Sequence, residues 1–408
     1  MGGALAGLTV LECGTRLGAA VCGRLLTDLG ADVLKIEPAI GDPARRAGPF
    51  PNDAPHPERS GLFAHLNRGK RGAVLDLDTE AGRAALRRLA ARSAVLIAGA
   101  TPAEIDRQGL GFSALAPINP ALVCTAITPF GLTGPYRDHA ASELVVTALS
   151  GVGYYVPGPV TDPAHEPPVQ PGGQIAAFGA GVQAATATMV AVLAARAGGG
   201  GQQVEVAEQD VLLDTLRMYL STWAYEGVNH PRDLARRPAG FGPPYWPCAD
   251  GYVWGVPGAG AGEYAWLQIV DLMGNPEWAQ EPQWLDAEFR RANADTIRAH
   301  VAAWTLGLPK ATVADLLQQR HIPCMAVNSI EELLTDEQLR LRGAFVPLDH
   351  PDLPGALVPR FPIRMAEAGV IEDSAPAPKL GEHTAAALTA AGYDAAERDW
   401  LFRAGVAR

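Results

Sequence analysis

The first third of the chain alternates short apolar segments with longer amphipathic ones. The apolar segments have the length and composition of buried strands and lie at residues 8–12, 32–37, 73–77, 94–97 and 121–126. Residues 16–29 and 79–91 have helical spacing, with Gly30 as a stop signal and Asp78 or Thr79 as a cap. This alternation of strand, helix and strand predicts an α/β fold with a largely parallel sheet.

An Ala-rich apolar segment at residues 175–195 predicts a long helix. The helix ends near Arg196 and Gly198–Gly201, which we interpret as a flexible turn into a strand at residues 203–206. A second helix is expected to begin near Ala207. Because the segment is dominated by Ala and carries polar glutamines, it is interpreted as a buried core helix rather than a membrane span.

Clusters of turn-forming residues divide the chain into three parts. Pro- and Gly-rich stretches predict loops at residues 157–173 and 231–250, and short helices dominate from there to about residue 346. We therefore expect a large Rossmann-like domain at residues 1–225 and a smaller α+β domain with linkers at residues 226–350. A return segment at residues 351–408 is expected to end in helices that pack on the large domain.

Composition restricts the partners and the compartment. Of the 408 residues, 48% are hydrophobic and 19% are charged, as in ordinary globular proteins. The net charge of −11 argues against nucleic acid or an anionic membrane surface as a partner. The cysteines are far apart, without metal-ligand spacing, which predicts buried free thiols in a reducing, cytoplasmic compartment and no metal site: Cys13, Cys22, Cys124, Cys248 and Cys324.

Common catalytic motifs are absent from the sequence. Gly14 and Gly18 follow the first predicted strand, but they do not form the glycine pattern of a dinucleotide site. The run Gly198–Gly201 lacks the Lys-Ser/Thr of a phosphate-binding loop. No zinc-protease histidine pair and no nucleophile elbow is present.

A series of short motifs runs in order along nearly the whole chain. They are Leu8-Thr9-Val10-Leu11-Glu12, residues 25–37, Gly41-Asp42-Pro43-Ala44-Arg45, Asn67 with Lys70-Arg71, Leu75-Asp76-Leu77, Asn119-Pro120, Phe130-Gly131, Thr133-Gly134-Pro135-Tyr136, Gly201-Gln202 with Val204-Glu205-Val206, Ile322-Pro323 and Leu380-Gly381-Glu382-His383-Thr384. Their order and spacing resemble those of the family III CoA-transferases, which also include carnitine-type CoA-transferases and alpha-methylacyl-CoA racemases.

The resemblance implies both a fold and an activity. Family members transfer CoA between carboxylic acids: an Asp attacks the acyl-CoA thioester, the acceptor acid takes the acyl group from the resulting anhydride, and the freed CoA thiolate then continues the exchange. Their subunits are open rings that interlock in a dimer, and CoA lies at the sheet end of the large domain. We therefore expect CoA or acyl-CoA as a substrate, no covalently bound cofactor, and an interlocked dimer.

The nucleophile position departs from this pattern. Aligned on the family's segment at residues 174–181, the Asp position falls on Ala177, and a methyl group cannot form an anhydride. The acidic residues considered as replacements are Asp162 and Glu166 upstream and Glu205 downstream. None of them lies at the start of the predicted helix, so we expect no catalytic residue in this chain.

Several CoA-facing positions also depart from the family. An Asn-aromatic pair is replaced by Gly99-Ala100, a Lys by Asp78, an Arg by Pro38, and an aromatic-Asp pair by Ser142-Glu143. The change at Asp78 replaces a phosphate-attracting charge with a repelling one. The candidates that remain for CoA binding are Arg16, Leu75 and Arg107, and Gly258–Gly262 partly matches the family's glycine loop. CoA binding by this chain is therefore expected to be weak.

Three functions are compatible with this sequence. The leading hypothesis is a non-catalytic subunit of a heteromeric CoA-transferase whose partner is a paralogue carrying the Asp. The analogy is with heteromers acting on dicarboxylic and aromatic acids, such as succinyl-CoA:benzylsuccinate CoA-transferase. The alternatives are an active homodimeric CoA-transferase or acyl-CoA racemase with a relocated carboxylate, and a non-catalytic CoA-thioester binding protein.

Overall fold

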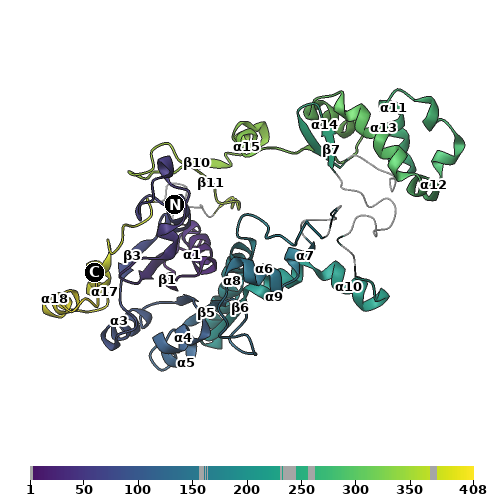
Figure 1. Cartoon of the computed structure of the whole chain (residues 1–408). Helices are drawn as coiled ribbons and strands as arrows, with labels where there is room; N and C mark the ends of the chain where they lie inside the picture. The colour runs from purple at the N-terminus through teal and green to yellow at the C-terminus, as the bar shows by residue number, and fades with distance from the viewer. Residues whose placement is uncertain are drawn as a thin grey trace. The chain divides into compact units, whose positions relative to one another are not determined.

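The computed structural model describes residues 3–155, 160, 162, 164–229, 232, 245–255, 262–367 and 375–408, which form two compact units (Figure 1). The larger unit comprises Met1–Gly153, Gln170–Arg217 and Leu341–Arg408, and the smaller comprises Tyr154–Val169 and Met218–Arg340. The sequence predicted domains at residues 1–225, 226–350 and 351–408. The limits of the two units do not coincide with these boundaries, and the division into three domains stays a prediction.

A six-stranded sheet forms the centre of the larger unit. Its strands are β1 (Thr9–Gly14), β2 (Asp32–Glu37), β3 (Arg71–Val74), β4 (Val95–Gly99), β5 (Val123–Thr128) and β6 (Gln202–Ala207). They lie in the order β3-β2-β1-β4-β5-β6, and each adjacent pair is parallel. The predicted α/β fold with a mostly parallel sheet is confirmed. The strand order reverses between β1 and β4, which is where open sheets of this kind bind ligands.

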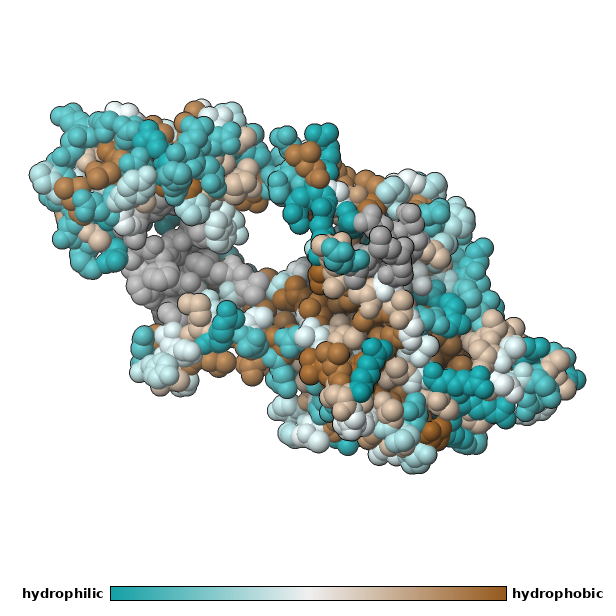
Figure 2. All heavy atoms as spheres, turned by 180° about the vertical axis from the view of Figure 1, so that it is seen from behind, coloured by the Kyte–Doolittle hydropathy of each residue, from teal (hydrophilic) through white to brown (hydrophobic). Residues whose placement is uncertain are grey.

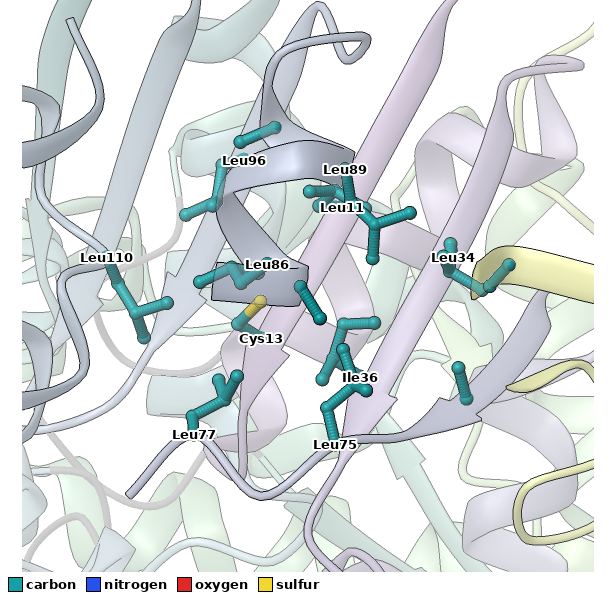
Figure 3. Close-up of a cluster of buried hydrophobic side chains, with 14 of the residues drawn as sticks. Leu11, Cys13, Leu34, Ile36, Leu75, Leu77, Leu86, Leu89, Leu96 and Leu110 are labelled. Atoms are coloured by element: carbon teal, nitrogen blue, oxygen red, sulfur yellow. The ribbon is translucent and has the colours of Figure 1, made fainter. Parts of the chain in front are cut away.

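Alternate residues of β1 pack into two different cores, because side chains on a strand point to opposite faces. Leu11 and Cys13 lie in a core with α3 and the C-terminal helices (Figure 3). Val10 lies in a second core, with residues of α1 and α8. The sheet is therefore buried on both faces, which explains why its strands are continuous apolar runs.

Short helices surround the sheet on both faces. The helices that follow β1 to β5 are α1 (Leu17–Asp28), α2 (Gly61–Asn67), α3 (Glu80–Ala90), α4 (Pro102–Gln108), α5 (Phe112–Leu115), α6 (Glu143–Leu149) and α7 (Val152–Tyr155). Those on either side of β6 are α8 (Ile175–Ala194), α9 (Glu208–Thr215) and α10 (Arg217–Glu226). Thr79 caps α3 by accepting a hydrogen bond from the N–H of Gly82, as the sequence pattern predicted.

Helix α8 packs closely on α1 through small residues. A Cβ at Gly181 would lie 2.5 Å from the Cβ of Val21, so only glycine permits this approach. Among the described residues, the segment Ile175–Gly199 is the one helix with the length and apolar composition of a membrane span, and half of its most apolar window is buried inside the protein. Packing against α1 is what a core helix does.

The C-terminal segment returns to the larger unit. β10 (Phe345–Pro347) and β11 (Leu357–Pro359) form a hairpin, and α17 (Thr384–Ala390) and α18 (Ala395–Arg403) follow. Thr384 Oγ1 accepts a hydrogen bond from the N–H of Val74 at 3.0 Å, and Leu75 pairs with Ala407. Helix α17 begins at Thr384, and His383 precedes it without a side-chain capping bond. Thr384 instead joins the helix to the edge of the sheet.

The smaller unit combines helices with a three-stranded sheet. Its strands are β7 (Tyr245–Cys248), β8 (Gly251–Trp254) and β9 (Met325–Ala326). Its further helices are α11 (Glu263–Leu272), α12 (Ala287–Ala292), α13 (Ala294–Leu306), α14 (Lys310–Gln318), α15 (Ile330–Thr335) and α16 (Glu337–Leu341). A core around Trp266 and Trp284 joins these elements, in agreement with the predicted α+β composition.

Candidate functional site

The start of α8 is the position at which the sequence predicted a missing nucleophile. The helix begins at Ile175 after Gln174, whose φ of 54° is left-handed, and its first turn contains no acidic residue. Ala177 is the third residue of the helix and is 4% exposed. Its methyl group offers no nucleophilic atom at this position.

A carboxylate from elsewhere in the chain lies at this helix start. Glu143, the first residue of α6, accepts hydrogen bonds from the N–H of Ala176 at 2.7 Å and of Ala177 at 3.3 Å. The N–H groups at a helix N-terminus lack partners within the helix and favour negative charge. Glu143 is therefore the acidic group that caps α8.

The acids that sequence reasoning considered have other contacts. Glu166 accepts a hydrogen bond from the N–H of Asp162 at 2.8 Å, within the smaller unit. Glu205 accepts one from the N–H of Leu132 at 2.5 Å and so holds the turn after β5. The expectation that these were the acids to consider was wrong, because Glu143 reaches the helix through folding and not through sequence proximity.

Arg16 lies near the start of α1, and its guanidinium is used inside the protein. Its Nε donates to Glu208 Oε1 at 3.1 Å, and Nη2 pairs with the other oxygen of the same carboxylate. Glu208 is buried, and burial raises its pKa, whereas Arg16 lowers it and the nearby charge of Glu143 raises it. Arg16, Glu208 and Glu143 thus form one charged group beside α8.

A pocket of about 200 Å³ lies at the carboxyl ends of β1 to β4, at the reversal of the strand order. Leu75 and Arg107, both predicted CoA contacts, line it together, whereas Arg16 does not. Ala100 and Pro38, which replace residue types common in the family, also line it. The acidic residues around it outnumber the single arginine, and they are Glu37, Asp76, Asp78 and Glu104.

Arg107 already has a carboxylate partner in this pocket. Its Nη1 lies 2.5 Å from Asp78 Oδ1, and Gln108 Nε2 donates to the same oxygen at 3.1 Å. These hydrogen bonds from Arg107 and Gln108 lower the pKa of Asp78, and Asp78 raises that of Arg107. A phosphate group that approached Arg107 would have to compete with this ion pair.

Similarity to a known protein family extends along almost the whole chain. The model of CoA-transferase family III matches residues 5–384. The chain belongs to CoA-transferase family III.

Relatives and one solved structure extend over nearly the full length. The chain is 31% identical over 390 residues to succinate–glutarate CoA-transferase of Agrobacterium fabrum, covering 94% of each. It is 31% identical over 392 residues to the BbsE subunit of succinyl-CoA:(R)-benzylsuccinate CoA-transferase of Thauera aromatica, covering 94% of this chain and 93% of the relative. A crystal structure of a CaiB/BaiF family protein from Brucella suis has a TM-score of 0.81 and 28% identity, and covers 96% of this chain and all of that one.

Four of the motifs shared with family III contribute one residue each to a buried ion network that includes residues of β1 and β2. Lys70 Nζ contacts Glu12 Oε2 at 2.7 Å, and Lys35 Nζ contacts both Glu12 at 2.8 Å and Asp42 at 2.7 Å. All four residues are 3% exposed or less. The Lys70-Arg71 and Gly41-Asp42 motifs therefore contribute buried charges that hold the fold.

Arg45 continues this network towards the C-terminal segment. Its guanidinium donates to both oxygens of Glu37 at 2.7 Å and to the carbonyl oxygen of Pro378 at 2.9 Å. Glu37 faces the pocket at the end of β2, so Arg45 neutralises one of the acids there.

The remaining predictions from the sequence concern the cysteines, metal sites and the glycine loop. The five cysteines are free and buried, as predicted. Within the described ranges, no group of three or more His, Cys, Asp or Glu side chains is placed to hold a metal ion. Gly258–Gly262 lies outside the described residues except for Gly262, so the expected glycine loop stays a prediction.

Part of the surface of the larger unit is apolar (Figure 2). Along α8, Val182, Val190 and Leu193 are 50–63% exposed and recur at helical spacing on one side of the helix. Leu144 and Leu149 of α6 are also exposed. Exposed apolar side chains gathered on one side of a helix are typical of interaction surfaces.

Proposed function

We propose that this chain is a subunit of a family III CoA-transferase that lacks its own nucleophile and acts as the structural partner of a catalytic paralogue. The observation that carries the proposal is the start of α8, where Ala177 presents a buried methyl group and no acid belongs to the first turn. In this family's reaction, a carboxylate attacks the acyl-CoA thioester and forms an anhydride. Ala177 cannot carry out that step.

The pocket at the sheet end supports the same proposal. The carboxylate of Asp78 forms an ion pair with the guanidinium of Arg107, and Glu104 and Asp76 add further negative charge to the pocket. A CoA phosphate gains little from a cation that is already paired. We therefore propose that CoA binds mainly to the partner subunit and only weakly to this chain.

Exposed apolar residues on α8 support a role in assembly. The exposed stripe with Val182 and Val190 costs free energy in water and is stabilised when a partner covers it. The relative BbsE is named as a subunit of an enzyme, and this supports a heteromeric assembly for this chain. We propose an interlocked dimer with the paralogue as this assembly.

Purification with and without the paralogue tests the proposal. The chain alone should transfer no CoA from succinyl-CoA to an acceptor acid, whereas the complex should be active. Within the complex, Ala177→Ser should leave the rate unchanged, and replacing the paralogue's Asp by Ala should abolish it. Turnover by the chain alone would overturn the proposal, and tight CoA binding without turnover in either form would favour a CoA-thioester binding protein.

A second candidate function is favoured by the position of Glu143. Its carboxylate lies at the helix start itself, within hydrogen-bond distance of the N–H of Ala177. If Glu143 attacked a thioester carbonyl, the thiolate of CoA would leave and a mixed anhydride between the donor acid and Glu143 would form. The acceptor carboxylate would attack the glutamyl carbonyl and displace the donor acid, and the CoA thiolate would then attack the acceptor carbonyl of the new anhydride, giving acceptor-CoA and freeing Glu143. The chain would in that case be an active CoA-transferase with a relocated carboxylate.

Trapping experiments separate these two functions. Hydroxylamine attacks the carboxyl carbon of the enzyme anhydride, releases the carboxylic acid and leaves a hydroxamate on the side chain. Peptide mass spectrometry after incubation with succinyl-CoA and hydroxylamine should find no hydroxamate on Glu143 if the chain is silent. Glu367→Gln provides a matched exposed control for Glu143→Gln in rate measurements.

A further inference from the structure

A second pocket, distinct from that at the sheet end, lies beside the start of α8. Its volume is about 500 Å³, and it is formed by residues 48–51, α2 and the β10–β11 hairpin, all within the larger unit. Most of its wall is apolar and includes Phe50, Leu62, Leu348, Leu353 and Leu357. A concave, mostly apolar site with few polar groups is typical of small-molecule pockets.

His65 is one of the two side chains with hydrogen-bonding atoms in this wall. Its Nδ1 is buried and has no hydrogen-bond partner among the described residues. A buried polar atom without a partner is uncommon in a folded protein and calls for an explanation. The imidazole therefore lines the pocket with hydrogen-bonding capacity that no described residue uses, whereas the carbonyl oxygen of His65 already accepts a hydrogen bond from Arg24.

The charges behind His65 are positive in sum. Arg24 Nε contacts Asp28 Oδ2 at 2.6 Å, and Arg68 Nη2 lies 4.0 Å from Asp28 Oδ1, so two guanidinium groups share one carboxylate. All three residues are 5% exposed or less. Burial, Arg24 and Arg68 together lower the pKa of His65 to about 4, so its imidazole is neutral at pH 7. The excess positive charge favours an anionic ligand group beside this ring.

The second polar side chain in the wall connects the pocket to the proposed function. Gln174 lines the pocket and directly precedes α8, three positions before Ala177. In a CoA-transferase the ligands that reach this helix start are carboxylic acids and their thioesters. The choice of ligand below rests on the proposed function to this extent.

We propose that this pocket binds a carboxylic acid with an apolar body, such as an aryl or branched-chain acid, with its carboxylate at His65 and its hydrocarbon part against Phe50, Leu62 and Leu353. A short dicarboxylate is disfavoured, because its second charge would lie in a mostly apolar wall whose one further polar side chain, Gln174, is uncharged. His65 then determines specificity for the acid group, and the leucines determine it for the body of the molecule.

Binding to the full-length protein tests this proposal without any turnover. Titration calorimetry at pH 7 would use 3-phenylpropanoate, succinate and the neutral alcohol 3-phenylpropanol as probes. We expect 3-phenylpropanoate to bind at least about tenfold more tightly than succinate, a difference of about 1.4 kcal/mol. Equal binding of the two acids, or preference for succinate, would contradict the proposal.

Two variants separate the acid contact from the apolar contact. His65→Phe should weaken the binding of 3-phenylpropanoate and leave the binding of 3-phenylpropanol unchanged. Ala356→Phe should fill the pocket and weaken the binding of both probes. His165→Gln, at a side chain 83% exposed, is the matched control and should change neither. If His65→Phe weakens acid and alcohol alike, the imidazole has only a structural role and the proposal fails.

The outcome is independent of the site of catalysis. If the chain proves active alone, the binding preference can still hold, and the proposed silent role fails by itself. If both acids bind equally, the pocket assignment fails, and the evidence from Ala177 and Arg107 is unaffected.

Discussion

Glu143 Oε2 accepts a hydrogen bond from the N–H of Ala177 at 3.3 Å, so a carboxylate from α6 caps the helix that lacks an acid of its own. Both oxygens of Glu143 contact backbone N–H groups of α8. A carboxylate held in this way stabilises the helix start through the helix dipole and its unpaired N–H groups. The same contacts leave the carboxylate's charge partly compensated, which suits a cap better than a nucleophile.

Restoring an acid at Ala177 should not restore function. Ala177→Asp places a new buried carboxylate beside Glu143 and close to the charge of Glu208, and the like charges repel. We expect a loss of about 1 kcal/mol or more in the free energy of unfolding, measured by urea denaturation, and no CoA transfer. Adding Glu143→Gln to the same protein should recover part of the loss. A variant as stable and as active as a catalytic transferase would contradict this account.

Releasing Arg107 should strengthen CoA binding. Asp78→Lys removes the carboxylate 2.5 Å from Arg107 and adds a second cation to the pocket. One charge-assisted hydrogen bond contributes about 1.5–3 kcal/mol, so the dissociation constant for CoA should fall about tenfold or more. Calorimetry at two salt concentrations measures the dissociation constant. Asp399→Lys, at an exposed position, makes the same change in net charge and serves as the control. Equal gains from both variants would show that Arg107 is not involved.

His65 should make the protein sensitive to acid. Its pKa is about 4 in the folded state against 6.5 as the ordinary value, so between these pH values the unfolded chain binds the extra proton. The free energy of unfolding should therefore fall as the pH decreases from 6.5 to about 4. His65→Gln should flatten this dependence in urea titrations at pH 7, 6 and 5, whereas His165→Gln should not. Identical slopes for wild type and His65→Gln would show that His65 is not buried as described.

The buried lysine and its exposed neighbour provide a matched comparison. Lys70→Met leaves Glu12 with Lys35 as its remaining cation in the core and should cost about 3–5 kcal/mol in unfolding free energy. Arg71→Met breaks the exposed pair with Asp32 and should cost about 1 kcal/mol or less. Adding Glu12→Gln to Lys70→Met should recover stability, because it removes the buried carboxylate charge that has lost one of its two lysines. Equal losses of unfolding free energy in Lys70→Met and Arg71→Met would contradict the role given to the buried network.

The fold could be predicted because its signals are local. The apolar run at residues 32–37 coincides with β2, and the Ala-rich segment from residue 175 with α8. Strands buried on both faces appear as continuous apolar runs, which short windows of sequence reveal. The limits of the two units were harder to predict from the sequence, because neither unit is one continuous stretch of chain. The smaller unit includes Tyr154–Val169, and the chain then returns to the larger unit at Gln170.

The site could be predicted only in part because its contacts join distant segments. Leu75 and Arg107, two of the residues predicted to contact CoA, line one pocket, since both follow strands whose carboxyl ends meet at one edge, and their contact with CoA stays a prediction. The pairing of Arg16 with Glu208 spans 192 residues, and that of Glu143 with Ala177 spans 34. No sequence spacing encodes such pairs. A sign in the sequence was that Ser142-Glu143 stands where the family pattern has an aromatic-Asp pair, but the sequence does not show that this Glu143 reaches α8.

Trapping of an enzyme-bound acyl group decides whether this chain has a catalytic carboxylate of its own. The purified chain, and its complex with the paralogue, would be incubated with succinyl-CoA and hydroxylamine and then analysed by peptide mass spectrometry. The account predicts a hydroxamate on the paralogue's Asp in the complex and none on any residue of this chain in either sample. A hydroxamate on Glu143 of the chain alone would contradict it.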